Sequence, residues 1–274
     1  MNIEPLEIDI KKVFEDKSPG LARKIPGFII NYLKRIIHQD EINVFLAQHG
    51  HKTGKDFTEA ILGLLSLKVN VKGINEIPLH ARYTFASNHP LGGLDGIALL
   101  DQIKGKFGDV KILANDILMN IKNLDPFFIP VNKHGGQNKD FLAAMNDTYA
   151  SDSQIAVFPA GLVSRRSRGI IRDLEWKKSF ITKTVKYERD VVPVHVSGRI
   201  SNFFYNLANF RKLLSVKTNI EMLYLPNEMF KFKNKEITIT FGKPISYKTF
   251  TKNKKPAEWA ADVKEKVYEL AKQE

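Results

Sequence analysis

YTFASNHPLGGLDG, residues 83–96, is the part of the sequence that limits the fold most strongly. The apolar run 83–86 is typical of a buried strand, and Pro90 followed by two glycines is typical of a tight turn. A helical pattern over 97–103 follows the turn. A strand, a turn and a helix in this order predict one unit of an α/β domain.

Outward from this unit, short apolar runs alternate with helical patterns along the chain. Strands are predicted over 67–71, 83–86, 110–113, 127–131, 155–158, 191–196 and 237–241. Helices are predicted over 97–103, 140–149, 176–187, 201–214 and 256–272. The predicted fold class is therefore α/β, with a mostly parallel central sheet flanked by helices. Residues 1–66 contain helical patterns only, so we expect an N-terminal helical subdomain over 1–66, with a membrane-interfacial position as one alternative, and an α/β domain over 67–274.

Composition limits the class of protein. The 274 residues include 43% hydrophobic and 26% charged residues, which is ordinary for a globular protein. The absence of cysteine excludes a disulfide scaffold, a thiolate metal site and a cysteine nucleophile. No apolar run reaches the roughly 20 residues of a membrane-spanning helix, so we expect a soluble or peripheral protein. The net charge of +12 predicts an anionic partner, which is nucleic acid, an acidic lipid surface or an acidic protein.

Residues 20–40 have the pattern of a basic amphipathic helix. Apolar side chains recur at steps of three and four residues, at Leu21, Ile25, Phe28, Ile29, Tyr32, Leu33, Ile36 and Ile37. Basic side chains lie between them, at Arg23, Lys24, Lys34 and Arg35. Such a helix either lies in a membrane interface or packs its apolar stripe on the domain core with the basic residues in water.

The turn after the strand at 83–86 carries a histidine and a carboxylate. In open α/β sheets, ligands bind at the carboxyl ends of strands, where His89 and Asp95 are expected. An imidazole accepts a hydroxyl proton near neutral pH, and a carboxylate on its other nitrogen orients it. The alternative interpretation is that Asp95 caps the helix and His89 only fills the turn.

Three further strand ends carry polar or basic turns. The strand at 155–158 is followed by three arginines, Arg165, Arg166 and Arg168. Guanidinium groups are suited to bind phosphate or carboxylate oxygens; the alternative interpretation is a basic loop in solvent. Lys133 follows the strand at 127–131. His195 alternates with valines and is expected to be a hydrogen-bonded core histidine.

Taken together, these segments resemble the glycerolipid acyltransferase superfamily, whose best-known members acylate 1-acylglycerol-3-phosphate. The resemblance spans about residues 80–200. In the family's order, the matching positions are Asn88-His89 with Asp95, then Phe158-Pro159 with Gly161, Ser164 and Arg165, then Val192-Pro193-Val194.

The sequence departs from the family pattern at several positions. Five residues separate His89 from Asp95, where the family usually has four. The family's glutamate, threonine and first arginine in the third block are Ala160, Leu162 and Val163. The second block lacks the family's Asp-Arg pair, and Lys133 is the nearest base. The resemblance therefore implies an intact catalytic pair and a remodelled acceptor pocket.

The resemblance implies an O-acyltransferase that moves a fatty acyl chain from an acyl-ACP or acyl-CoA thioester to the hydroxyl of a lysophosphatidate-like lysolipid. His89 and Asp95 are the expected catalytic residues, without a metal or a cofactor. The expected substrate-binding residues are Asn88, Gly92, Gly93, Lys133, Phe158, Pro159, Gly161, Ser164, Arg165, Arg166 and Arg168. We expect a cytoplasmic protein, peripheral on the inner face of the cell membrane and attracted to its anionic surface.

The same sequence leaves other functions open. Within the same class, a lyso-amino-acid lipid (lyso-ornithine or lyso-glycine) is the alternative acceptor; the missing phosphate-binding residues favour it, whereas the retained arginines favour lysophosphatidate. A catalytically silent lipid-binding module is a further alternative. Nucleic-acid binding is not expected, because the lysines are scattered and no zinc-finger or RNA-recognition signature is present. A serine hydrolase is disfavoured because the sequence has no Gly-x-Ser-x-Gly elbow.

Overall fold

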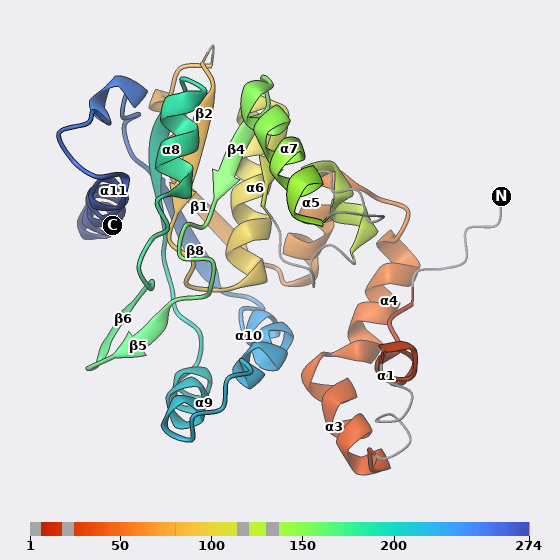
Figure 1. The fold of residues 1–274 in the computed structure, drawn as a ribbon. Helices are drawn as coiled ribbons and strands as arrows, with labels where there is room; N and C mark the ends of the chain where they lie inside the picture. The colour runs from red at the N-terminus through yellow and green to blue at the C-terminus, as the bar shows by residue number, and fades with distance from the viewer. Residues whose placement is uncertain (1–6, 18–24, 80, 114–120, 130–136, 274) are drawn as a thin grey trace.

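The strand predicted at 83–86 lies in the middle of the sheet (Figure 1). The computed structural model describes residues 7–17, 25–79, 81–113, 121–129 and 137–273. The strands are β1 (Lys68–Lys72), β2 (Tyr83–Ser87), β3 (Val110–Ile112), β4 (Gln154–Val157), β5 (Arg165–Ser167), β6 (Ile170–Arg172), β7 (Asp190–Val196) and β8 (Glu236–Phe241). The helices are α1 (Ile10–Lys17), α3 (Gly27–Ile36), α4 (Gln39–His49), α5 (Gly54–Leu64), α6 (Gly93–Phe107), α7 (Gln137–Ala150), α8 (Ser179–Lys186), α9 (Asn202–Leu213), α10 (Leu225–Phe230) and α11 (Pro256–Leu270). Short 3₁₀ turns are η1 (Ile74–Glu76), η3 (Lys122–Phe127), η4 (Ile220–Tyr224), η5 (Tyr247–Thr249) and η6 (Ala271–Gln273).

The six-stranded sheet has the order β1-β8-β7-β2-β4-β3. β2 pairs in parallel with β7 and β4, and the β1–β8 and β3–β4 pairs are also parallel. Only β7 and β8 pair antiparallel within this sheet. The predicted α/β class with a mostly parallel central sheet is therefore confirmed.

Helices cover both faces of the sheet because the strands are apolar on both faces. Phe85 and Val192 belong to the apolar cluster that contains Leu99 of α6, whereas the adjacent residues Ala86 and Val191 belong to the cluster with α8 and α11. All four of these strand residues are fully buried. Successive side chains of a strand point to opposite faces, so continuous apolar runs indicate a sheet buried between two helical layers.

The N-terminal helices share the core of the α/β body. Phe57 and Ile61 of α5 lie in the same apolar cluster as Phe85 of β2, and α5 packs along α6. α3 is less buried, since Phe28 is 74% exposed while Ile30 and Ile36 face the protein. The predicted division between 1–66 and 67–274 stays a prediction. Across the described ranges, no helix combines the length and apolarity needed to cross a bilayer.

Two local predictions differ from the structure. The described part of the predicted strand 127–131 is not a regular strand. Residue 127 ends the 3₁₀ turn η3, which contains Pro126, and Phe128 makes only an isolated bridge to Ile112. Residues 130 and 131 lie outside the described ranges. The sequence prediction also missed the hairpin of β5 and β6, whose turn residues Arg168 and Gly169 have φ angles of 49° and 81°. Two adjacent positive φ angles are typical of the hairpin turn whose twist matches that of its strands.

Candidate active site

His89 and Asp95 form a hydrogen-bonded pair at the carboxyl end of β2. The Nδ1 atom of His89 lies 2.8 Å from Oδ1 of Asp95, which is in the first turn of α6. The second carboxylate oxygen, Oδ2, accepts a hydrogen bond of 2.8 Å from the backbone N–H of Leu91. Asp95 is fully buried, whereas the side chain of His89 is 18% exposed. The pair thus has a buried orienting acid and an imidazole that reaches solvent.

The turn between His89 and Asp95 depends on Gly92. Its φ is +73°, and a Cβ there would lie 3.0 Å from a methyl carbon of Leu225 in α10. A side chain at this position would therefore be both strained and crowded. Gly92 precedes α6 without a side-chain cap, so the first amides of the helix, which have no intrahelical partner, lie beside the pair. Asp95 is thus inside the helix rather than at its cap position.

The pKa of His89 reflects opposing influences. Burial lowers the pKa, whereas the charge and hydrogen bond of Asp95, together with the charge of Asp173, raise it. Arg165 is near enough to lower it slightly, and the net pKa lies above the ordinary value of 6.5. The ring also stacks on Phe158, with centroids 4.2 Å apart and planes inclined by 24°. Within the described part of the chain, Nε2 of His89 makes no hydrogen bond, so it is the nitrogen that can accept a proton.

Asp173 is a functional candidate that the sequence analysis missed. Its Oδ1 accepts hydrogen bonds from the backbone N–H of His89 (3.2 Å) and from the hydroxyl of Ser164 (2.6 Å). The N–H of Ser164 in turn donates to the carbonyl of His89 at 2.7 Å. Trp176 donates its indole N–H to Oδ2 of Asp173 at 2.9 Å. The backbone of the histidine is therefore held by Ser164, in the loop after β4, and by Asp173, directly after β6.

Asp173 has only a weak signal in the sequence. It follows the basic run 165–172 directly and precedes an apolar helix, which is the ordinary place of a helix cap. Its link to His89 spans 84 positions, so only the fold brings the two together.

Asn88, expected to bind substrate, directs its amide to the backbone of β7. Its Nδ2 donates to the carbonyl of Val196 at 2.9 Å, and its Oδ1 accepts from the N–H of the same residue at 2.7 Å. Asn88 is 2% exposed. Asn88 thus joins the ends of β2 and β7 and so fixes the position of the adjacent His89, and its expected role in substrate binding stays a prediction.

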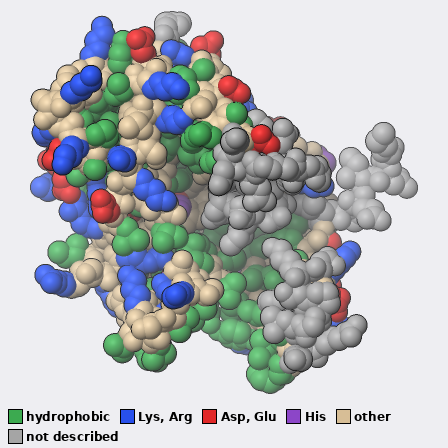
Figure 2. All heavy atoms as spheres, viewed as in Figure 1, with side chains coloured by type: hydrophobic (Ala, Val, Ile, Leu, Met, Phe, Trp, Pro, Cys, Tyr) green, Lys and Arg blue, Asp and Glu red, His purple; other side chains and the backbone are tan. Residues whose placement is uncertain are grey.

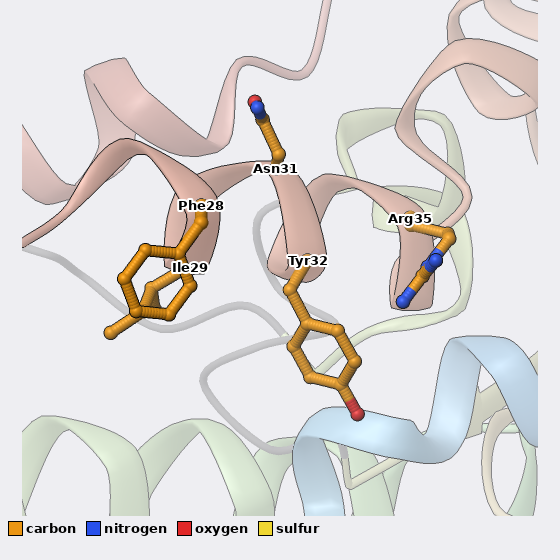
Figure 3. A pocket seen from close by; sticks show the side chains of 5 residues that line it. All are labelled: Phe28, Ile29, Asn31, Tyr32 and Arg35. Atoms are coloured by element: carbon orange, nitrogen blue, oxygen red, sulfur yellow. The ribbon is translucent and has the colours of Figure 1, made fainter.

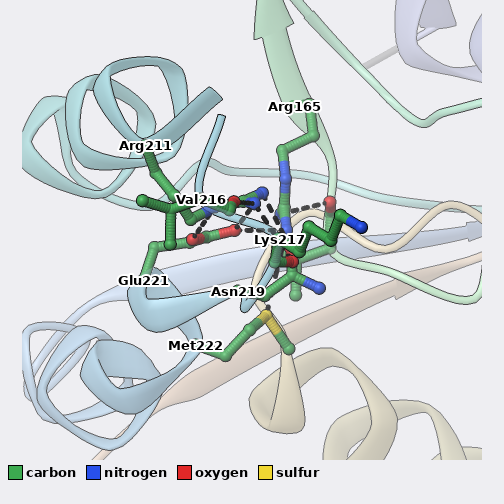
Figure 4. A network of polar contacts seen from close by, with 8 residues as sticks. Arg165, Arg211, Val216, Lys217, Asn219, Glu221 and Met222 are labelled. Carbon is green, nitrogen blue, oxygen red and sulfur yellow. Dashed lines mark hydrogen bonds and ion pairs between the residues drawn. The ribbon is translucent and has the colours of Figure 1, made fainter. Parts of the chain in front are cut away.

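Arg165, also expected to bind substrate, is buried in an ion-pair network (Figure 4). It donates to Oε1 of Glu221 at 3.0 Å and to the carbonyl of Val163 at 2.7 Å. Arg211 of α9 donates to Oε2 of the same glutamate at 2.9 Å. Arg165 is 5% exposed and Glu221 is fully buried, so the guanidinium is engaged by protein groups. Through Glu221 it links β5 to α9, and its expected role as a substrate ligand stays a prediction.

The other predicted substrate-binding residues lie at different distances from the pair. Phe158, Ser164 and Gly92 contact His89 or its turn, as described above, and Gly93 begins α6. Pro159 and Gly161 form the turn after β4, in which the N–H of Gly161 donates to the carbonyl of Phe158 at 2.9 Å. Arg166 donates to Asn202 and Asn206 of α9, and Arg168 is exposed at the hairpin turn. Lys133 lies outside the described residues. Phe158, Ser164 and Gly92 therefore lie at the His89–Asp95 pair, whereas Arg166 and Arg168 lie on the β5–β6 hairpin.

His195, predicted to be a core histidine, is 8% exposed in β7, and its ring centroid lies 6.1 Å from that of Tyr268.

Among the described residues, no group of three or more acidic or histidine side chains is placed to hold a metal ion. The pairing of His89 with buried Asp95 supports proton removal by an oriented imidazole beside a helix N-terminus.

Comparison with known proteins gives consistent matches. A family model described as Acyltransferase matches residues 12–273. A protein of Bacteroides thetaiotaomicron named lyso-glycine lipid O-acyltransferase is 54% identical over 265 residues, covering 96% of this chain and 97% of that protein. A protein of the same name from Phocaeicola vulgatus is 52% identical, covering 96% of this chain and 95% of its own length. Among solved structures, the 1-acyl-sn-glycerophosphate acyltransferase of Thermotoga maritima matches with a TM-score of 0.46 and 18% identity, covering 95% of this chain and 86% of that one.

Proposed function

Because this chain belongs to the acyltransferase family, we propose that it transfers a fatty acyl chain from a thioester to the free hydroxyl of a lyso-glycine lipid. The observation that carries the proposal is the 2.8 Å contact between His89 and buried Asp95, which leaves Nε2 of the imidazole available. The names of the two relatives, each more than half identical over nearly the whole chain, support the acceptor.

In the proposed reaction, Nε2 of His89 removes the proton of the acceptor hydroxyl, and Asp95 holds Nδ1–H and stabilises the imidazolium. The hydroxyl oxygen attacks the carbonyl carbon of the thioester. The carbon–sulfur bond then breaks, and the imidazolium returns its proton to the departing thiolate. The products are an ester and a free thiol, and no acyl-enzyme is required. Backbone amides at the start of α6, after Gly92, are the proposed donors to the oxyanion.

The choice of acceptor depends on the anionic group that it presents. A glycine head group ends in a carboxylate, and of the three arginines expected to bind it, Arg166 and Arg168 are not buried with Glu221. Arg165 is not available to bind a phosphate acceptor, because its guanidinium forms a buried ion pair with Glu221. Lysophosphatidate remains the second candidate, since Arg166 and Arg168 also suit a phosphate.

The donor is proposed to be an acyl-ACP or an acyl-CoA, both of which are anionic and match the net charge of +12.

The acceptor resides in membranes, and we propose that α3 contacts the anionic inner face of the cell membrane. Figure 3 shows a pocket on this helix lined by Phe28, Ile29, Asn31, Tyr32 and Arg35. Phe28 is 74% exposed, and Arg35 lies over the Tyr32 ring at 5.4 Å. Exposed aromatic side chains beside a basic residue are typical of an interfacial helix.

The test is an acyl-transfer assay on purified protein with a labelled acyl thioester. Lyso-glycine lipid, lysophosphatidate and no acceptor are compared, and both the thiol and the new ester are measured. The proposal predicts stoichiometric thiol and O-acylated glycine lipid, with lyso-glycine lipid preferred. Preference for lysophosphatidate would overturn the acceptor assignment. Vesicle binding without thiol release on any acceptor would instead identify a silent lipid-binding module.

A further inference from the structure

The segment of α9 and η4, residues 202–224, leaves a row of large apolar side chains in solvent. α9 buries Phe204, Tyr205 and Ala208 against the protein. Its opposite side and the loop after it expose Phe203, Phe210, Leu213, Leu214, Ile220 and Leu223. Leu213 is 79% exposed and Phe210 58% exposed. Phe203 and Phe210 are seven residues apart and so fall on one side of α9, and we name the six exposed side chains together the α9 surface. Large exposed apolar patches of this kind mark interaction sites.

Along the chain, the segment that carries the α9 surface has bases and no acids. Residues 191–220 contain no Asp or Glu, but they contain Arg199, Lys212 and Lys217 besides the buried Arg211. Lys212 and Lys217 are exposed beside the leucines. The first acid after this range, Glu221, is buried and paired with two arginines. The α9 surface thus combines exposed apolar side chains with the exposed Lys212 and Lys217 of the same segment, which is complementary to an anionic lipid surface.

The α9 surface lies at the same end of the molecule as α3. In Figure 1, β4 points toward the end where α9, α10 and α3 lie, and in Figure 2 hydrophobic side chains gather along that edge. The two parts are joined directly, because the hydroxyls of Tyr32 and Tyr224 lie 2.7 Å apart. The Tyr224 ring also packs edge-on against Phe203, at 4.9 Å between centroids. One flat surface can therefore contact both helices on the side where the strand ends carry His89.

We propose that the α9 surface is a membrane-docking surface that inserts its apolar side chains into an anionic bilayer, next to the contact made by α3. This inference depends on the proposed function in one respect, which is that the lysolipid acceptor resides in a membrane. An acidic carrier protein is the other anionic partner, but a row of large apolar side chains as exposed as Leu213 and Phe210 favours the interior of a bilayer over a charged protein surface.

The ion-pair network attaches the α9 surface to the candidate active site. Arg211, on the buried side of α9, and Arg165, one residue after Ser164, share Glu221. Ser164 in turn holds the backbone of His89. Docking through α9 therefore fixes the orientation of the catalytic loop relative to the bilayer.

The test uses the triple variant Phe210→Ser, Leu213→Ser and Leu214→Ser in the full chain. Co-sedimentation is measured with vesicles of equal parts phosphatidylglycerol and phosphatidylcholine. We expect the partition coefficient to fall by about tenfold or more, since three large apolar side chains are lost from the interface. The matched control is Leu142→Ser with Val185→Ser, which are exposed apolar residues of α7 and α8. We expect this control to bind within about twofold of the wild type.

A second measurement separates docking from catalysis. Thiol release is followed with an acceptor dispersed in detergent micelles, and we expect the triple variant to keep the wild-type rate because none of its positions touches the histidine. Unchanged vesicle binding by the triple variant overturns the proposal, and so does an equal loss in the control. Retained vesicle binding with loss of binding to an acyl carrier protein assigns the α9 surface to an acidic protein instead. Absence of thiol release by a wild type that still binds vesicles would count against the proposed function alone.

Discussion

At the residue scale, His89 is held by more than its pairing with Asp95. Asn88 fixes the strand end before it, Phe158 stacks on its ring, and Ser164 and Asp173 hold its backbone. An imidazole restrained in this way loses little further freedom when a substrate hydroxyl arrives, and such preorganisation is a general requirement of efficient catalysis.

The pH dependence of activity tests the electrostatic part of this account. The imidazole acts as a base only when neutral, and its pKa lies above the ordinary 6.5, so kcat/KM should rise with pH through a midpoint above that value. Asp173→Asn removes a negative charge that raises the pKa of His89. We therefore expect the midpoint to move to lower pH in this variant.

The control for this prediction is Glu265→Gln, which removes an exposed carboxylate paired with Arg172. It should leave the midpoint unchanged. A midpoint that stays in place or moves upward in Asp173→Asn would contradict the assignment, whereas a purely structural role of Asp173 would lower the rate without moving the midpoint.

The secondary-structure elements show what the sequence could and could not predict. The pattern of apolar runs predicted β2, β4 and β7 and the helices that cover them, because burial on both faces produces continuous apolar strands. His89 and Asp95 were predicted as a pair because only five residues lie between them along the chain. The role of Arg165 was not predictable, since its partner Glu221 lies 56 positions away and joins it only in the folded chain.

At the element scale, the Glu221 network should dominate the stability of the junction between β5 and α9. Glu221→Gln leaves two buried guanidinium groups without a carboxylate, and we expect a loss of about 3–5 kcal/mol in the free energy of unfolding. Urea unfolding followed by circular dichroism measures this difference.

The matched control is Asp262→Asn, which breaks an exposed ion pair with Lys254 at 2.6 Å. Exposed pairs contribute little, so the change there should be below about 1 kcal/mol. Equal stability of Glu221→Gln and the wild type would show that the network does not hold β5 to α9.

At the scale of the whole molecule, the net charge of +12 makes association with anionic partners depend on salt. The Debye length falls from about 10 Å at 0.1 M salt to about 3 Å at 1 M. Partition onto vesicles that contain phosphatidylglycerol should therefore weaken as salt is added, while weak binding to phosphatidylcholine alone changes little. Partition that is independent of salt would mean that charge has no part in the association.

The most direct test of the account is a single-turnover measurement of thiol release from the acyl thioester in the presence of lyso-glycine lipid. Wild type, His89→Ala, Asp95→Asn and the control His51→Ala, an exposed histidine, are compared after circular dichroism confirms folding. We predict that His89→Ala and Asp95→Asn are each slower by about 10²- to 10⁴-fold, the usual contribution of general-base catalysis, and that His51→Ala matches the wild type. A folded His89→Ala protein that releases thiol at the wild-type rate would contradict the account.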